Sequence, residues 1–153
     1  IRPLVYNNLK TIVQTEDYLM LNIEWMHWSR IIRIDDKQHM PATLATYDGD
    51  SIGWWEGDTL VVETINFMDQ PHQPADRKVI ERFRPNNGGG LVYSFKVEDA
   101  DYTDSYSGEM VWPNSYQANY EYACHEGNHS MAGTLAGARV QEREHREQNG
   151  SED

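Results

Sequence analysis

The ten residues from Tyr120 to His129 hold the densest group of reactive side chains in the chain: two tyrosines, two histidines, two glutamates and the only cysteine. Within them, His125, Glu126 and His129 match H-E-x-x-H, the pattern in which two histidines one helical turn apart bind zinc and the glutamate activates water. Gly127 weakens the helix that this geometry requires. We therefore interpret the match as coincidental and keep a metal site as an alternative.

A second group of ionisable residues lies at Glu24, His27 and Arg30. Ionisable side chains inside a barrel are costly unless paired, so a cluster of them indicates either a site or a structural network. A histidine beside a carboxylate is a general acid–base pair, and an arginine can hold a substrate carboxylate. Tyr122 could donate to a developing oxyanion. The predicted catalytic residues, expected to converge on one cavity, are Glu24, His27, Arg30, Tyr122, His125 and Glu126.

The same residues also have structural interpretations. Glu24 and His27 could be a satisfied pair in the core. His125 and Glu126 could cap the start of a helix, where a carboxylate meets the positive end of the helix dipole. The acidic segment 98–104 lacks the pattern of an EF-hand calcium loop and is expected to be an exposed edge.

Short strands with turn signals between them must position these residues. Residues 18–26 and 91–97 alternate apolar and polar side chains, which is the period of a strand. The turn Glu56–Asp58, with Gly57 at its centre, separates two further strands and is expected to be exposed. The strands are predicted at 10–15, 18–26, 27–34, 51–55, 59–67, 78–84, 91–97, 105–112 and 120–123.

Eight or nine such strands without an intervening helix predict an all-β fold, an antiparallel, calycin- or lipocalin-like β-barrel. One helix follows, at about 125–145, with Met131, Leu135 and Ala138 on a face that should pack on the strands. Residues 1–153 are thus predicted to form a single barrel domain with a C-terminal helix and a frayed tail.

Composition limits the possible partners. The formal net charge of −12 disfavours nucleic acid and anionic membrane surfaces, which need a basic face. No apolar run approaches the roughly 18 residues of a membrane span. Charge repulsion favours a monomer or small oligomer. No signal peptide is recognised and the chain opens at Ile1, so we expect a processed or trimmed product.

The runs Gly-Asp-Ser-Ile-Gly-Trp-Trp-Glu-Gly-Asp-Thr-Leu-Val-Val-Glu-Thr (49–64) and Tyr-Glu-Tyr-Ala-Cys-His-Glu-Gly-Asn (120–128) resemble a large family of mostly secreted bacterial proteins without a settled function. The segments 12–15, 24–32 and 81–83 are similar to it as well. The resemblance covers roughly residues 6–139 and implies a periplasmic or secreted location. The chain departs from the family pattern at His129, where members commonly have Tyr.

Several functions remain open at this point. The first is a small-molecule-binding barrel that works as an acid–base enzyme (lyase, isomerase or hydrolase) in its cavity. The second is a non-catalytic barrel that binds an apolar or aromatic ligand. The third is a metal-dependent enzyme that uses His125 and His129 with Glu24 or His27, and a fourth is a subunit of an assembly. No cofactor is identified by the sequence.

Overall fold

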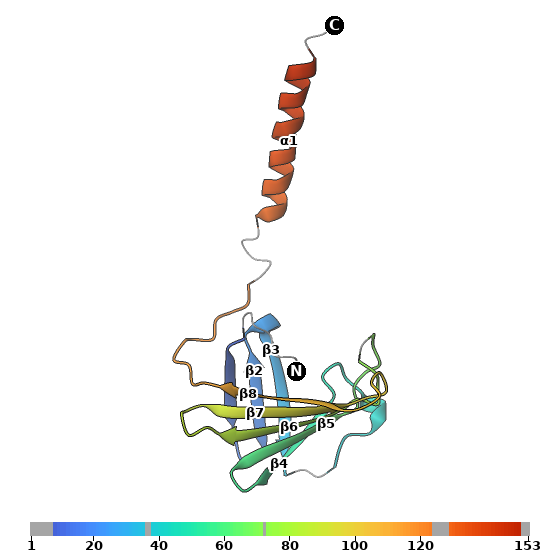
Figure 1. Cartoon of the computed structure of the whole chain (residues 1–153), viewed down its shortest axis with the longest axis vertical. Coiled ribbons are helices and arrows are strands. Elements are labelled where there is room, and N and C mark those ends of the chain that lie inside the picture. Colours follow the sequence, from blue (N-terminus) through green and yellow to red (C-terminus); the bar gives the residue numbers. More distant parts are fainter. Residues whose placement is uncertain (1–7, 36–37, 72, 124–128, 151–153) are drawn as a thin grey trace. The chain divides into compact units, whose positions relative to one another are not determined.

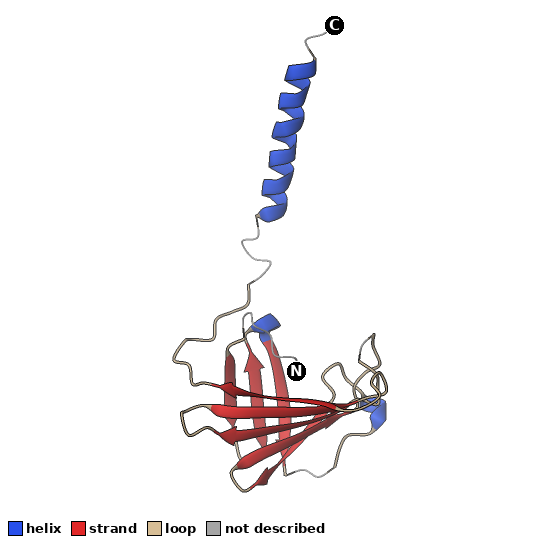
Figure 2. Ribbon diagram, viewed as in Figure 1, coloured by secondary structure: helices blue, strands red, loops and turns tan. Residues whose placement is uncertain are grey.

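The computed structural model describes residues 8–35, 38–71, 73–123 and 129–150. The chain divides into two compact units, Ile1–Tyr120 and Glu121–Asp153. The first holds one curled sheet of eight strands with the curl of a half-barrel, and the second holds the helix α1 (Figures 1 and 2). The strands are β1 (Lys10–Gln14), β2 (Tyr18–Ile23), β3 (Trp28–Ile34), β4 (Asp50–Glu56), β5 (Thr59–Ile65), β6 (Lys78–Pro85), β7 (Leu91–Glu98) and β8 (Tyr106–Trp112). The prediction of an all-β, barrel-like fold with a C-terminal helix is confirmed.

The order of strands in the sheet follows the chain, and neighbours are antiparallel except at one junction. There, β3 and β4 are parallel and share only two register pairs, Arg33 with Ile52 and Ile34 with Gly53. The prediction of a wholly antiparallel sheet is wrong at this point. A tight turn would have reversed the chain, whereas the long segment 35–49 returns it to the sheet in its original direction.

The small overlap lets the strands β1–β3 stand across the strands β4–β8 (Figure 1). The apolar positions of each strand recur with a period of two, so they share the inner face of the curl. Side chains from the two groups meet there and form the main core. Its buried members include Leu21, Ile32, Leu60, Val62 and Phe83.

The edge strands β1 and β8 have no backbone pairing with each other in the described part of the chain. Side chains nevertheless connect them. The ammonium of Lys10 lies 4.6 Å from the centroid of the Trp112 ring. The amide of Asn119 donates to Thr11 Oγ1 at 3.2 Å and to Asn22 Oδ1 at 3.0 Å, which ties the segment after β8 to β1 and β2.

A charged network joins five segments on the outer face of the sheet. His39 contacts Asp50 (Nδ1–Oδ2, 2.7 Å) and Glu63 (Nε2–Oε1, 3.2 Å). Arg33 donates to both oxygens of Asp50 at 2.9–3.0 Å, and Lys78 pairs with Glu63. The network holds the segment that contains His39 against β3, β4 and β5.

Residues 120–123 are not a strand, since none of them pairs with the sheet in the described structure. The turn Glu56–Asp58 is exposed, as predicted. The segment 98–104 is mostly exposed, but the side chain of Asp99 is fully buried in an ion pair with Arg77 at 2.8 Å. That carboxylate therefore has a structural partner and does not belong to a solvated edge.

The second unit contains one helix in its described part. Its helix α1 (Ser130–Asn149) begins after His129 and contains no buried residue. Glu142 and Arg146 form an ion pair one helical turn apart. The predicted packing of Met131, Leu135 and Ala138 on the strands stays a prediction.

The assignment of the sheet faces predicts that substitutions at two adjacent isoleucines of β3 differ strongly in their effect on stability. Ile32 is 0% exposed and Ile31 is 53% exposed. We expect Ile32→Ala to lower the free energy of unfolding by about 2–5 kcal/mol, because it leaves a cavity in the core. The matched control Ile31→Ala should change it by about 0.5 kcal/mol or less. Urea denaturation measures both, and equal effects would contradict the face assignment.

Candidate binding cavity

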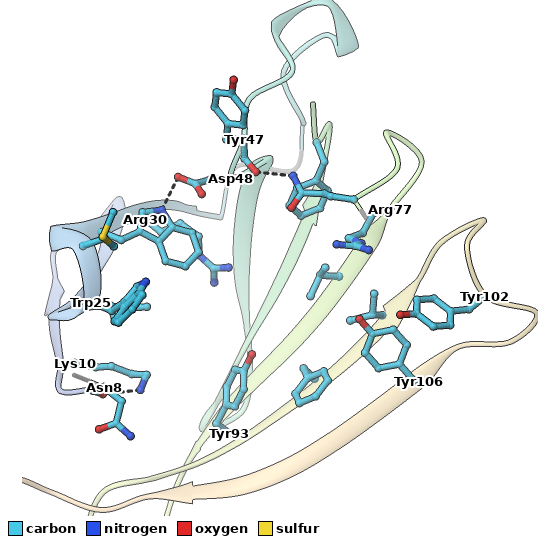
Figure 3. Close-up of a pocket in the computed structure, with 18 residues that line it drawn as sticks. Asn8, Lys10, Trp25, Arg30, Tyr47, Asp48, Arg77, Tyr93, Tyr102 and Tyr106 are labelled. Carbon is cyan, nitrogen blue, oxygen red and sulfur yellow. Dashed lines mark hydrogen bonds between the residues drawn. The ribbon is translucent and has the colours of Figure 1, made fainter. Parts of the chain in front are cut away.

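A cavity of about 950 Å³ opens on the inner face of the curled sheet, in the first unit (Figure 3). We call it the inner cavity. Its wall is apolar where β6 and β7 contribute Val79, Phe95 and Val97, with Phe67 beside them. Its volume lies at the upper end of the range of small-molecule sites, roughly 300–1,000 Å³.

The corner between β2 and β3 brings aromatic side chains to the inner cavity. It is a short 3-10 turn, η1 (Trp25–His27), in which Met26 and His27 adopt φ values of 58° and 52°. Such left-handed conformations cost non-glycine residues roughly 1–2 kcal/mol each and are retained only where the surroundings impose them. This turn directs Trp25, Met26 and Trp28 to the cavity. The Trp28 indole is fixed there, because its Nε1 donates to Asp48 Oδ2 at 2.6 Å.

A series of aromatic rings follows β7 and β8 along the opposite wall. Tyr93 stacks on Trp112 with centroids 4.4 Å apart and on Phe95 at 5.9 Å. The ring of Phe95 meets Tyr106 edge to face at 6.4 Å. Phe95 lies directly against the backbone of Gly108, where a Cβ atom would come within 2.8 Å of the ring. The absence of a side chain at Gly108 is what allows Phe95 this position.

A buried ionic network lies where the apolar core meets the inner cavity. Arg30 Nη2 donates to Glu81 Oε2 at 2.6 Å, and the Tyr93 hydroxyl donates to Glu81 Oε1 at 2.9 Å. Arg30 is 7% exposed and Glu81 is 0% exposed. Glu81 lies on β6, so the network connects β3 with β6 and β7 across the core.

The surroundings keep this network in one protonation state. Burial alone would raise the pKa of the Glu81 carboxyl, but the charge of Arg30 and the hydrogen bonds from Arg30 and Tyr93 outweigh it and lower that pKa. Burial, with the negative charge of Glu81, strongly raises the pKa of Tyr93. Glu81 is thus a carboxylate and Tyr93 a neutral hydrogen-bond donor at neutral pH.

The predicted catalytic residues are distributed unevenly around the inner cavity. Arg30 lines it, and its guanidinium points into it (Figure 3), but the carboxylate that it holds is Glu81 of this same chain. Glu24 and His27 are not among the described residues that line the cavity. The side chain of His27 is exposed, so the interpretation of Glu24 and His27 as a core pair is wrong.

The remaining predicted residues belong to the second unit or lie outside the described residues. Tyr122 is in the second unit. His125 and Glu126 lie outside the described residues, so their convergence with Glu24 and His27 stays a prediction. Among the residues that the structure describes, no group of three or more His, Cys, Asp or Glu side chains could hold a metal ion. His129 precedes the first residue of α1, so α1 does not supply the helical turn that H-E-x-x-H requires.

Sequence reasoning did not select Glu81, Tyr93 or Lys10 as site residues. One signal was present for Glu81: in the strand 78–85 it stands between Val79 and Phe83 on the apolar face, where a charged residue demands a partner. Arg30 stands likewise between inward-facing Trp28 and Ile32. Two opposite charges at inward positions of two strands predict a buried pair.

Comparisons with known proteins give no match to a family model, to a curated protein or to a solved structure. Among the described residues, no helix is long and apolar enough to cross a membrane.

The buried network yields a stability prediction. Glu81→Gln should lower the free energy of unfolding by about 3–5 kcal/mol, because the charge of Arg30 stays buried without its partner. The double variant Arg30→Met with Glu81→Met should recover most of that loss, since apolar residues of similar volume often replace a buried pair without cost. Glu56→Gln, which removes the exposed partner of Arg82, is the control and should have little effect. A double variant as unstable as the single one would contradict the pairing.

The same network predicts the direction of acid sensitivity. Because the pKa of Glu81 is lower in the folded protein than its ordinary value of 4.5, its ionisation contributes stability above that value. This contribution should be lost as the pH falls through the folded-state pKa. We expect the free energy of unfolding of the Arg30→Met, Glu81→Met double variant to fall less than that of the wild type as the pH is lowered from 5. Urea denaturation at each pH measures both. The same acid dependence in both proteins would show that Glu81 does not contribute.

Proposed function

We propose that the protein binds a small molecule with an apolar or aromatic body in the inner cavity. The observation that carries the proposal is the combination of an open apolar cavity with polar side chains at fixed positions in its wall. Val79, Phe95 and Val97 offer the apolar surface, while Trp28 and Arg30 are held by hydrogen bonds to Asp48 and Glu81. Sites for small molecules typically combine these two features.

The strained corner at Met26 and His27 supports the same function. Its left-handed residues lie in the loop that joins β2 to β3, and this loop directs Trp25 and Trp28 to the cavity. Strain of this kind is concentrated at ligand sites. The aromatic series from Tyr93 through Phe95 to Tyr106 offers further ring surface to a flat ligand.

A binding role accounts for the cavity better than acid–base catalysis. A general base must reach the proton that it abstracts at about 2.6–3.2 Å, directly or through one water. Glu81 is fully buried and both of its oxygens accept hydrogen bonds, while Glu24 and His27 do not line the cavity among the described residues. We therefore favour the non-catalytic binding function.

A neutral dye tests this proposal. Phenylnaphthylamine, whose fluorescence rises in apolar surroundings, should bind with one site per chain and accept energy from Trp25 and Trp28. Val97→Phe adds bulk to the cavity wall and should weaken binding several-fold. Val111→Phe, the same change at a 53% exposed position of β8, should leave binding unchanged. Equal affinity for all three proteins, or no binding to any of them, would overturn the proposal.

A further inference from the structure

Among the described residues, more cations than anions line the inner cavity, although the chain as a whole is acidic. The chain has 25 Asp and Glu against 13 Lys and Arg. The described residues that line the cavity include three cations, Lys10, Arg30 and Arg77, and one anion, Asp48. Glu81 balances Arg30, and Asp99 balances Arg77, so Lys10 is the cation of this described wall whose charge is not compensated.

Arg30 has one donor without an acceptor. Its Nη2 serves Glu81, but Nε is buried and makes no hydrogen bond. The side chain is more than nine-tenths buried, and its guanidinium points into the cavity (Figure 3). A buried N–H without an acceptor costs about 1–3 kcal/mol, and an oxygen that reached this atom would remove that cost.

Lys10 lines the same cavity without a carboxylate partner among the described residues. Its ammonium donates to the backbone carbonyl of Asn8 at 2.7 Å and lies over the Trp112 ring. Partial burial lowers the pKa of Lys10, which means that water is partly removed from a cation that no described anion neutralises. Asp48, the one anion of the described wall, lies well apart from Lys10 (Figure 3) and already accepts from Trp28.

We propose that the ligand of the inner cavity is an organic acid: an apolar or aromatic body that carries an anionic oxygen group. The anion is bound by the Lys10 ammonium and the Nε–H of Arg30. The body lies against Phe95 and Val97, away from Asp48. This inference rests on the proposed function and adds the chemical class of the ligand to it.

Two dyes with one skeleton test the inference. Anilinonaphthalene sulfonate carries an anionic sulfonate on the ring system of the neutral phenylnaphthylamine. We expect Lys10→Gln to weaken the anionic dye about tenfold, since a charge-assisted contact contributes about 1.5 kcal/mol or more. Binding of the neutral dye should not change. The matched control Lys96→Gln removes an exposed cation of β7 that does not line the cavity and should affect neither dye.

The outcomes separate the two proposals. Loss of the anionic dye alone on Lys10→Gln supports an acid as ligand. Suppose that the neutral dye binds, and that Lys10→Gln weakens the binding of both dyes equally or of neither. The inference that the ligand is an organic acid is then overturned, while the proposed binding function stands. That inference is also overturned if Lys96→Gln weakens binding of the anionic dye as much as Lys10→Gln does. If neither dye binds to the wild type, the proposed function fails and the acid with it.

Discussion

A fully buried carboxylate requires an equally buried partner, and this constraint organises the first unit. Glu81 lies on the apolar face of β6, where desolvation of its charge is costly unless it is paired and hydrogen-bonded. Arg30 and Tyr93 meet that requirement from β3 and β7. Because they come from different strands, satisfying one carboxylate fixes how β1–β3 lie across β4–β8. The same contacts hold Arg30 and Tyr93 in the wall of the inner cavity.

Much of the fold could be predicted from local patterns. Alternating side chains and turn residues give eight strands, and the apolar positions of β2 and β7 identify the inner face. The parallel junction of β3 and β4 could not be predicted, because the register of two strands joined by a long segment has no local signal. Residues 120–123 have strand-like composition without a partner strand, and composition alone does not make a strand.

The site was harder to predict than the fold, because it depends on contacts between distant residues. Arg30 and Glu81 are 51 positions apart in the sequence. Arg30 was predicted as a site residue because it lies near Glu24 and His27 in the sequence, and these two residues do not line the cavity. The sequence predicts that Glu24 and His27 converge on the cavity, but neither residue lines it. The turn after β2 instead directs Trp25 and Trp28 to the cavity. Each lies one position after the predicted residue, and in a strand a shift of one residue moves a side chain to the other face. Lys10 gave no signal, since a single lysine in a short strand is ordinary.

The two-pair junction between β3 and β4 also has a consequence for the route by which the chain folds. The strands β4–β8 form an uninterrupted meander whose contacts are local in sequence, so their loop-closure entropy is small. The hairpin β2–β3 is equally local. Joining these two pieces depends on a short parallel overlap and on the distant Arg30–Glu81 pair. We therefore expect the docking of these two pieces to be the slow step of folding, and the inner cavity to form only at that step.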